Sequence, residues 1–209
     1  YLTDAPKLIA LSTAKPREYG QVAQIRTYSL KLTRSLSRKI EAFCLQERIT
    51  PFIYFLTAYQ LLLMHHSTHK EVIVGVPVSD RSLPGTKDAI GFFINTIPIR
   101  LQISGEETVR ELISNNFENI KKCFRHQSLP LASLLSALKI ERDISYEPLF
   151  QVLFVMQNNF DSKIEGSHVQ GELFWGESGQ LAYDLALEII PREHSEGNYY
   201  QVQLKYNEN

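Results

Sequence analysis

A nearly continuous apolar segment constrains the fold of this chain more than any other feature. The segment Phe52–Met64 is interrupted only by Thr57 and Gln60. The preceding pair Thr50-Pro51 supplies a helix N-cap and a favourable first-turn residue. A helix that is apolar nearly all round must be buried, and this one is too short to span a membrane. The segment therefore predicts a buried helix within a soluble domain.

Strand and helix patterns alternate along the rest of the sequence. Partial alternation of apolar residues predicts a strand over Gln24–Leu32, and helical spacing predicts a helix around Leu36–Cys44. A capping box at Thr108–Glu111 opens another helix, and Pro130 begins a shorter one. The capped helix has an apolar face of Val109, Leu112, Ile113, Ile120 and Phe124. The further predicted strands are Val72–Val78, Asn95–Ile103, Phe150–Gln157, Val169–Trp175, Leu181–Ile190 and Tyr199–Tyr206. The pattern predicts an α/β lobe with a mixed sheet flanked by helices.

Composition limits the partners that this lobe can attract. The 209 residues carry 22 Lys and Arg against 23 Asp and Glu, a net charge of −1. General attraction to nucleic acid or to an anionic membrane is therefore not expected. Cys44 and Cys123 both lie in apolar helical stretches, where free cysteines act as small core residues. This usage favours a reducing, cytoplasmic location.

The beginning of the chain differs from the remainder. Residues 1–20 contain Pro6 and Pro16 and show no sustained apolar period, which predicts an extended linker. Residues 21–209 form the predicted domain.

Three segments resemble sequence motifs of one enzyme family. Ile90–Arg100, sequence IGFFINTIPIR, resembles the fifth core motif of the condensation domains of non-ribosomal peptide synthetases. His126–Pro130 resembles the sixth motif, and Arg142–Val152 resembles the seventh. The segment Val74–Val78 with Arg81 is similar to the strand that precedes the fifth motif. Their order and separation agree with the family, and the resemblance covers nearly the whole chain.

The sequence departs from the family at several positions. Ser128 stands where the family usually has Asp, Leu131-Ala132 where it has Phe-Glu, and Tyr146-Glu147 where it has Arg-Asn. The His-His-x-x-x-Asp-Gly signature, which in this family lies in the N-terminal lobe, does not occur in the sequence. The resemblance therefore identifies a C-terminal lobe without the catalytic histidine.

The adjacent histidines His65 and His66 need a separate explanation. The segment His65–Glu71 superficially resembles the double-histidine signature, but Lys70 and Glu71 stand where Asp and Gly are required. Histidines at a helix C-terminus are stabilised by the helix dipole. His65 and His69 alone would supply only two zinc ligands. We therefore predict no metal site.

The resemblance implies the fold and the chemistry. It implies one lobe of the chloramphenicol acetyltransferase-like fold, forming one wall of a tunnel between two lobes. Family members join an acyl or peptidyl thioester on one carrier protein to an aminoacyl amine on the next. The expected partners are the N-terminal lobe and the carrier proteins. Their phosphopantetheine arms carry the substrates, and no cofactor is expected on the lobe itself.

Several residues are singled out by these motifs, and none is expected to be the catalytic base. Asn95 is expected to face the tunnel, or else to cap backbone at a strand end. Gly91 either permits close backbone approach or forms a turn. His126 is expected to satisfy the last helical carbonyls, and Arg142 and Asp143 to form ion pairs. The remaining motif positions are Phe93, Thr96, Arg100, Gln127, Pro130 and Pro148.

Two other functions remain open at the level of sequence. One is a non-catalytic module that binds carrier proteins, and the other is the lobe of an epimerisation or cyclisation domain. In an isolated lobe, apolar surface that normally contacts the N-terminal lobe would be uncovered. We therefore expect either self-association or a mobile stretch within Phe160–Gly179.

Overall fold

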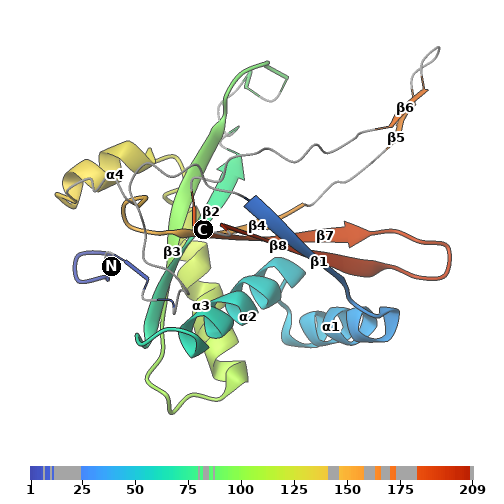
Figure 1. Cartoon of the computed structure of the whole chain (residues 1–209), viewed down its shortest axis with the longest axis horizontal. Coiled ribbons are helices and arrows are strands. Elements are labelled where there is room, and N and C mark those ends of the chain that lie inside the picture. The colour runs from blue at the N-terminus through green and yellow to red at the C-terminus, as the bar shows by residue number, and fades with distance from the viewer. Residues whose placement is uncertain are drawn as a thin grey trace.

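A computed structural model describes residues 1–6, 8–9, 11, 25–79, 81, 85–86, 88–140, 146–157, 163–165, 170–172 and 183–207 (Figure 1). The predicted positions Arg142 and Asp143 lie outside these residues, as does most of the segment 160–179. Among the described residues, none of the helices combines the length and apolarity required to cross a membrane. Cys44 and Cys123 are both free.

Six strands form the main sheet. In chain order they are β1 (Ile25–Lys31), β2 (Glu71–Ser79), β3 (Ile94–Gln102), β4 (Val152–Met156), β7 (Leu185–Arg192) and β8 (Tyr199–Asn207). Their order in space is β1-β8-β7-β4-β2-β3. The central strand β4 is parallel to both β2 and β7, and the other pairings are antiparallel. The predicted mixed sheet is confirmed. Two short strands, β5 (Lys163–Glu165) and β6 (Gln170–Glu172), pair with each other in a separate hairpin.

Helices α1 (Arg34–Glu47), α2 (Pro51–His65) and α3 (Val109–Phe124) lie together on one side of the sheet (Figure 1). The predicted N-caps are confirmed, because Thr50 accepts from the Ile53 N–H and Thr108 forms a capping box with Glu111. The main core lies between these helices and the sheet. Leu56 of α2, Val74 of β2 and Phe154 of β4 are fully buried there.

A second, smaller cluster of buried apolar side chains lies outside the main core. Ile73 of β2 contributes to it together with Leu149 and Phe150. Helix α4 (Leu131–Ala137) packs against this cluster through half-buried leucines. None of the residues of α4 is fully buried, so this short helix depends on one-sided packing.

The helix faces differ from the prediction at three positions. Leu62 lies in the helix predicted to be buried, but its side chain is 51% exposed. The helical spacing also predicts Leu36 and Val109 on apolar faces, but these two side chains are 44% and 62% exposed. Both lie in the first turn of a helix, at the margin of the packed face. Ile40, Cys44, Leu112, Ile113 and Ile120 are buried as predicted.

Candidate functional site

Asn95 connects the fifth and sixth motifs. It is the second residue of β3, and its Nδ2 donates to the Gln127 and Leu129 carbonyls at 2.7 and 2.8 Å. Its Oδ1 accepts from the Leu131 N–H at 3.3 Å. Both amide protons and one oxygen lone pair are therefore used to hold the connection between α3 and α4 against β3. The backbone-capping role considered for Asn95 is present, whereas a direct role in a tunnel remains a prediction.

The sixth motif forms the tight connection that Asn95 holds. The backbone N–H groups of Arg125, His126 and Gln127 satisfy the last carbonyls of α3. The His126 imidazole is exposed and makes no hydrogen bond to any residue that the structure describes. The expected capping role of this side chain is therefore not observed. Pro130 is the N-cap of α4, and its carbonyl accepts from Ser133 and Leu134.

The loop before β3 is organised by one arginine. Arg81 places its guanidinium 4.5 Å from the centre of the Phe93 ring and donates to the Ala89 carbonyl at 2.8 Å. Gly91 does not adopt a positive φ. A side chain there would bring its Cβ within 3.0 Å of the Phe93 ring, so close approach explains this glycine better than a turn.

Apolar side chains project from this region. Ile90 and Phe92 are almost completely exposed, and Ile94 and Leu129 are about half exposed. These four residues belong to the fifth and sixth motifs. We call them the exposed motif patch. Exposed apolar clusters are often found where proteins contact partners.

Arg100 closes the fifth motif at the other end of β3. Its Nε donates to Glu71 on β2 at 2.9 Å, and both side chains are largely buried. Its backbone N–H donates to the Tyr1 hydroxyl at 2.7 Å, which in turn donates to the Arg100 carbonyl. Burial raises the pKa of Tyr1 well above its ordinary value. Arg100 thus fastens Tyr1 to β3, which is an edge strand of the main sheet. The remaining fifth-motif position, Thr96, is half-buried and pairs with Pro77 in the β2–β3 ladder.

The seventh motif enters the sheet through Pro148, which is half-buried and precedes the buried Leu149 and Phe150. Gln151 is buried, accepts from the Ile9 N–H at 2.9 Å and donates to the Glu147 carbonyl at 2.7 Å. Gln151 therefore joins the N-terminal segment at Ile9 to the seventh motif. This role was missed, because the partner Ile9 is distant in sequence.

The histidine pair lies away from these motifs. His65 and His66 are exposed at the end of α2, with their rings edge to face at 5.2 Å between centres. Within the part of the chain that the structure describes, no three His, Cys, Asp or Glu residues are grouped to hold a metal.

Comparison with known proteins identifies the family. The condensation-domain family model matches residues 2–209. One subunit of linear gramicidin synthase from Brevibacillus parabrevis is 40% identical over 165 residues, which is 78% of this chain and 3% of the relative. Another subunit of the same synthase is 36% identical over 192 residues, 91% of this chain and 2% of the relative. The chain therefore spans only a small part of these curated relatives.

Solved structures support the same fold. A four-domain nonribosomal peptide synthetase bound to AMP and glycine matches 99% of this chain and 16% of its own, with a TM-score of 0.88 and 22% identity. The condensation domain of the monacolin K polyketide synthase matches 99% of this chain and 49% of its own, with a TM-score of 0.77 and 19% identity. The chloramphenicol acetyltransferase-like fold predicted for one lobe is confirmed. The chain belongs to the condensation-domain family.

Proposed function

We propose that this chain is the C-terminal lobe of a peptide-bond-forming condensation domain of a non-ribosomal peptide synthetase. The observation that carries the proposal is the Asn95 connection, which assembles the fifth and sixth motifs into one face with exposed apolar side chains. The coverage is consistent with one lobe of two, because the chain spans 43–49% of several matched condensation-domain structures. Residues 1–20 would then be the linker to the N-terminal lobe.

In this proposal the lobe supplies positioning instead of the catalytic base. Aminolysis of a thioester requires the amine to be held close to the carbonyl carbon, and such positioning can lower the barrier substantially. The substrates would arrive on the phosphopantetheine arms of donor and acceptor carrier proteins, with no cofactor held by the lobe. The exposed motif patch would contact the N-terminal lobe. A cytoplasmic location is part of the same proposal.

The direct test compares the isolated chain with a two-lobe protein. The isolated chain, given loaded donor and acceptor carrier proteins, should form no amide above the uncatalysed rate. Joined to an N-terminal lobe that carries the double-histidine signature, it should become active, since a general base contributes about 10²–10⁴-fold. Turnover by the isolated chain would refute the assignment of catalysis to the other lobe.

A variant of Asn95 tests the role of the connection. In the two-lobe protein, Asn95→Asp keeps one acceptor for the Leu131 N–H but removes both donors, and should lower the condensation rate constant. Ser133→Ala, an exposed change on the adjacent helix α4, is the matched control. An unchanged rate and an unchanged denaturant midpoint for Asn95→Asp would show that the connection does not position the site.

A second candidate function is a non-catalytic binding module. The X-domain from teicoplanin biosynthesis matches 99% of this chain with a TM-score of 0.87 and 17% identity, and another structure shows that domain in complex with OxyB. Failure of the joined two-lobe protein to form amide, together with retained binding of carrier proteins, would favour this candidate.

A further inference from the structure

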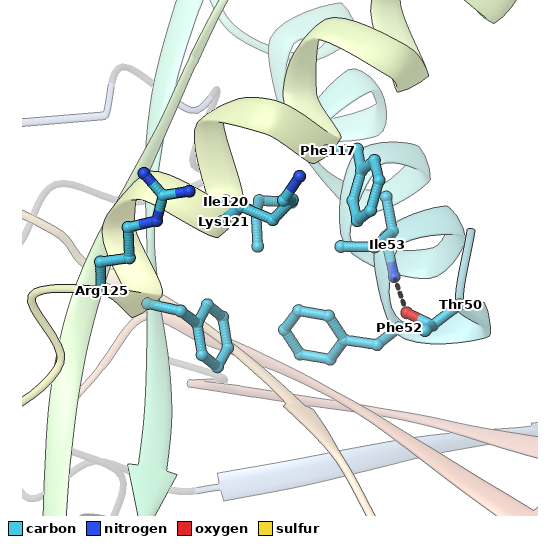
Figure 2. Close-up of a pocket in the computed structure, with 8 residues that line it drawn as sticks. Thr50, Phe52, Ile53, Phe117, Ile120, Lys121 and Arg125 are labelled. Atoms are coloured by element: carbon cyan, nitrogen blue, oxygen red, sulfur yellow. Dashed lines mark hydrogen bonds between the residues drawn. The ribbon is translucent and has the colours of Figure 1, made fainter. Parts of the chain in front are cut away.

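A pocket of about 440 Å³ lies between the first turn of α2 and the C-terminal half of α3 (Figure 2). It is lined by Thr50, Phe52, Ile53, Phe117, Ile120, Lys121, Phe124 and Arg125. Its volume falls within the range of about 300–1,000 Å³ that is typical of small-molecule sites. None of these side chains is a hydrogen-bond partner of Asn95, although Arg125 directly precedes the sixth motif and its backbone belongs to the same connection.

The apolar lining is held in place by ring packing. Phe52 packs edge to face against Phe124 at 5.9 Å and against the buried Phe154 at 5.4 Å between ring centres. Phe117 is half-buried and lies under the Lys121 amino group, 5.1 Å from its ring centre. Three half-buried rings, with Ile53 and Ile120, therefore form an apolar surface on this side of the pocket.

Positive charge borders this apolar surface on one side. Lys121 belongs to the last turn of α3, Arg125 is the C-cap residue one helical turn further on, and both residues line the pocket (Figure 2). Lys121 forms an ion pair with Glu118, in which the Lys121 Nζ lies 3.0 Å from the Glu118 Oε1. Arg125 is exposed and has neither an ion pair nor a hydrogen bond from its side chain to any described residue. Its guanidinium is therefore available as a planar pair of donors, the geometry that matches a carboxylate.

A hydroxyl completes the polar groups. The Thr50 oxygen accepts from the Ile53 N–H at 3.4 Å, which leaves the hydroxyl proton available for a ligand oxygen. The site thus combines an aromatic base, a guanidinium with no ion pair to a described residue, and one partly neutralised ammonium. Such a set suits a single negative charge attached to an apolar body.

We propose that this pocket binds a small monocarboxylate with an aromatic or medium-length aliphatic body. The apolar body packs on Phe52, Phe117 and Phe124, and the carboxylate pairs with Arg125. Lys121 adds a weaker attraction because Glu118 already neutralises part of its charge. This site goes beyond the proposed condensation function and does not depend on it.

The test uses 4-phenylbutyrate and the neutral 4-phenylbutanol as probes of the 209-residue chain. Binding is followed through the ¹³C-methyl NMR signals of isoleucine, because Ile53 and Ile120 line the pocket, whereas Ile73 and Ile189 are buried elsewhere. The carboxylate should shift the Ile53 and Ile120 signals and bind about tenfold more tightly than the alcohol.

Two variants distinguish carboxylate binding in the pocket from general attraction of an anion to the positive charges of α3. Arg125→Gln should reduce the preference for the carboxylate about tenfold while leaving alcohol binding unchanged. Lys122→Gln removes an exposed cation of α3, and this cation does not line the pocket. This variant should change neither the preference for the carboxylate nor the affinity for the alcohol. Thermal melts of both variants check that the fold is retained.

Three results would overturn the proposal. The first is equal affinity for the acid and the alcohol, and the second is shifts confined to isoleucines outside the pocket. The third is a dependence of the Ile53 and Ile120 signals on protein concentration without ligand, which would identify this face as a contact between two copies of the chain.

Discussion

Gly75 illustrates how a single absent side chain decides the packing of a strand. It lies in the middle of β2, opposite Leu153 of β4. A Cβ at this position would overlap the Phe150 ring and lie 2.8 Å from Leu153 Cδ2. The strand could accommodate other residues by backbone conformation alone, since Gly75 does not adopt a positive φ. The glycine is therefore required by close packing of the seventh motif on β2.

Gly75→Ala should accordingly destabilise the chain by about 1–3 kcal/mol, the usual cost of overpacking a core. Phe150→Leu removes the ring that the new methyl group would meet. In denaturant unfolding, the double variant should therefore lose less free energy than the two single variants combined. Strictly additive losses would show that the ring does not set the requirement for glycine.

At the scale of elements, a buried amide network joins two helices to β3. Asn116 of α3 donates from Nδ2 to Thr57 Oγ1 and to Gln60 Oε1, both on α2 and both at 2.8 Å. Gln60 in turn donates to the Ile99 carbonyl of β3 at 3.1 Å. All three side chains are buried. The network fixes how α2 and α3 sit relative to the strand that carries the fifth motif.

Asn116→Ala should lower the free energy of unfolding by about 1–3 kcal/mol, because it leaves the buried Gln60 oxygen without a donor. Asn115→Ala, an exposed change on the same helix, should stay within about 0.5 kcal/mol of the wild type. Urea midpoints measured on both variants check this contrast. Equal losses would mean that helix propensity, and not the network, determines the effect.

The network also shows what the sequence could and could not predict. Helix starts at Thr50 and Thr108 were predictable because a cap is a local signal within four residues. Thr57 and Gln60 were visible as polar breaks in an apolar helix, yet their partner Asn116 is far away in the sequence. The contacts of Asn95 and Gln151 were hidden for the same reason. Family motifs identified the relevant residues, but long-range packing decided their roles.

The turn before α3 carries a local pH dependence. The Glu107 carboxylate accepts from the backbone N–H groups of Ser104 and Gly105 at 3.0–3.1 Å. Hydrogen bonds from Ser104, followed by weaker local contributions, lower the pKa of Glu107 to about 2. A lowered pKa in the folded state stabilises the fold above the unfolded value, and this stabilisation is lost as the pH falls.

Stability that depends on Glu107 should therefore disappear between about pH 4.5 and pH 2. Glu107→Gln should be less stable than the wild type at neutral pH, and the difference should shrink across this range. The effect should be small because Glu107 is only partly covered and solvent screens its charge. Glu106→Gln, whose carboxylate makes no hydrogen bond to a described residue, should follow the wild-type pH profile in urea titrations. A constant difference for Glu107→Gln would contradict the assignment.

At the scale of the whole molecule, helices α1–α3 gather on one side of the main sheet (Figure 1). The hairpin β5–β6 and the loop end of β2 and β3 extend away from those helices (Figure 1). The exposed motif patch of Ile90, Phe92, Ile94 and Leu129 lies around the β3 end of this loop. The exposed motif patch therefore lies at the end opposite the main helical layer, whereas other exposed apolar side chains, Leu45 and Leu62 among them, lie on the helices themselves.

We expect the isolated chain to self-associate through this patch. Ile90→Ser together with Phe92→Ser should shift light scattering over a concentration series toward the monomer. Leu45→Ser, which removes an exposed apolar residue of α1, is the control and should not alter association. A strictly monomeric wild-type chain at all concentrations would contradict this expectation. The related expectation for Phe160–Gly179 remains a prediction and calls for amide exchange.

The pairing of β1 with β8 has a consequence for biosynthesis. Ile25 lies opposite Asn207, and the two strands remain in register to Lys31 and Gln201. Strand β1 leaves the ribosome well before β8, which is its neighbour in the main sheet of the described residues. The β1 edge of the sheet cannot form until β8 has also been synthesised. Synthesis thus exposes β1 to chaperones or to wrong strand partners until β8 emerges.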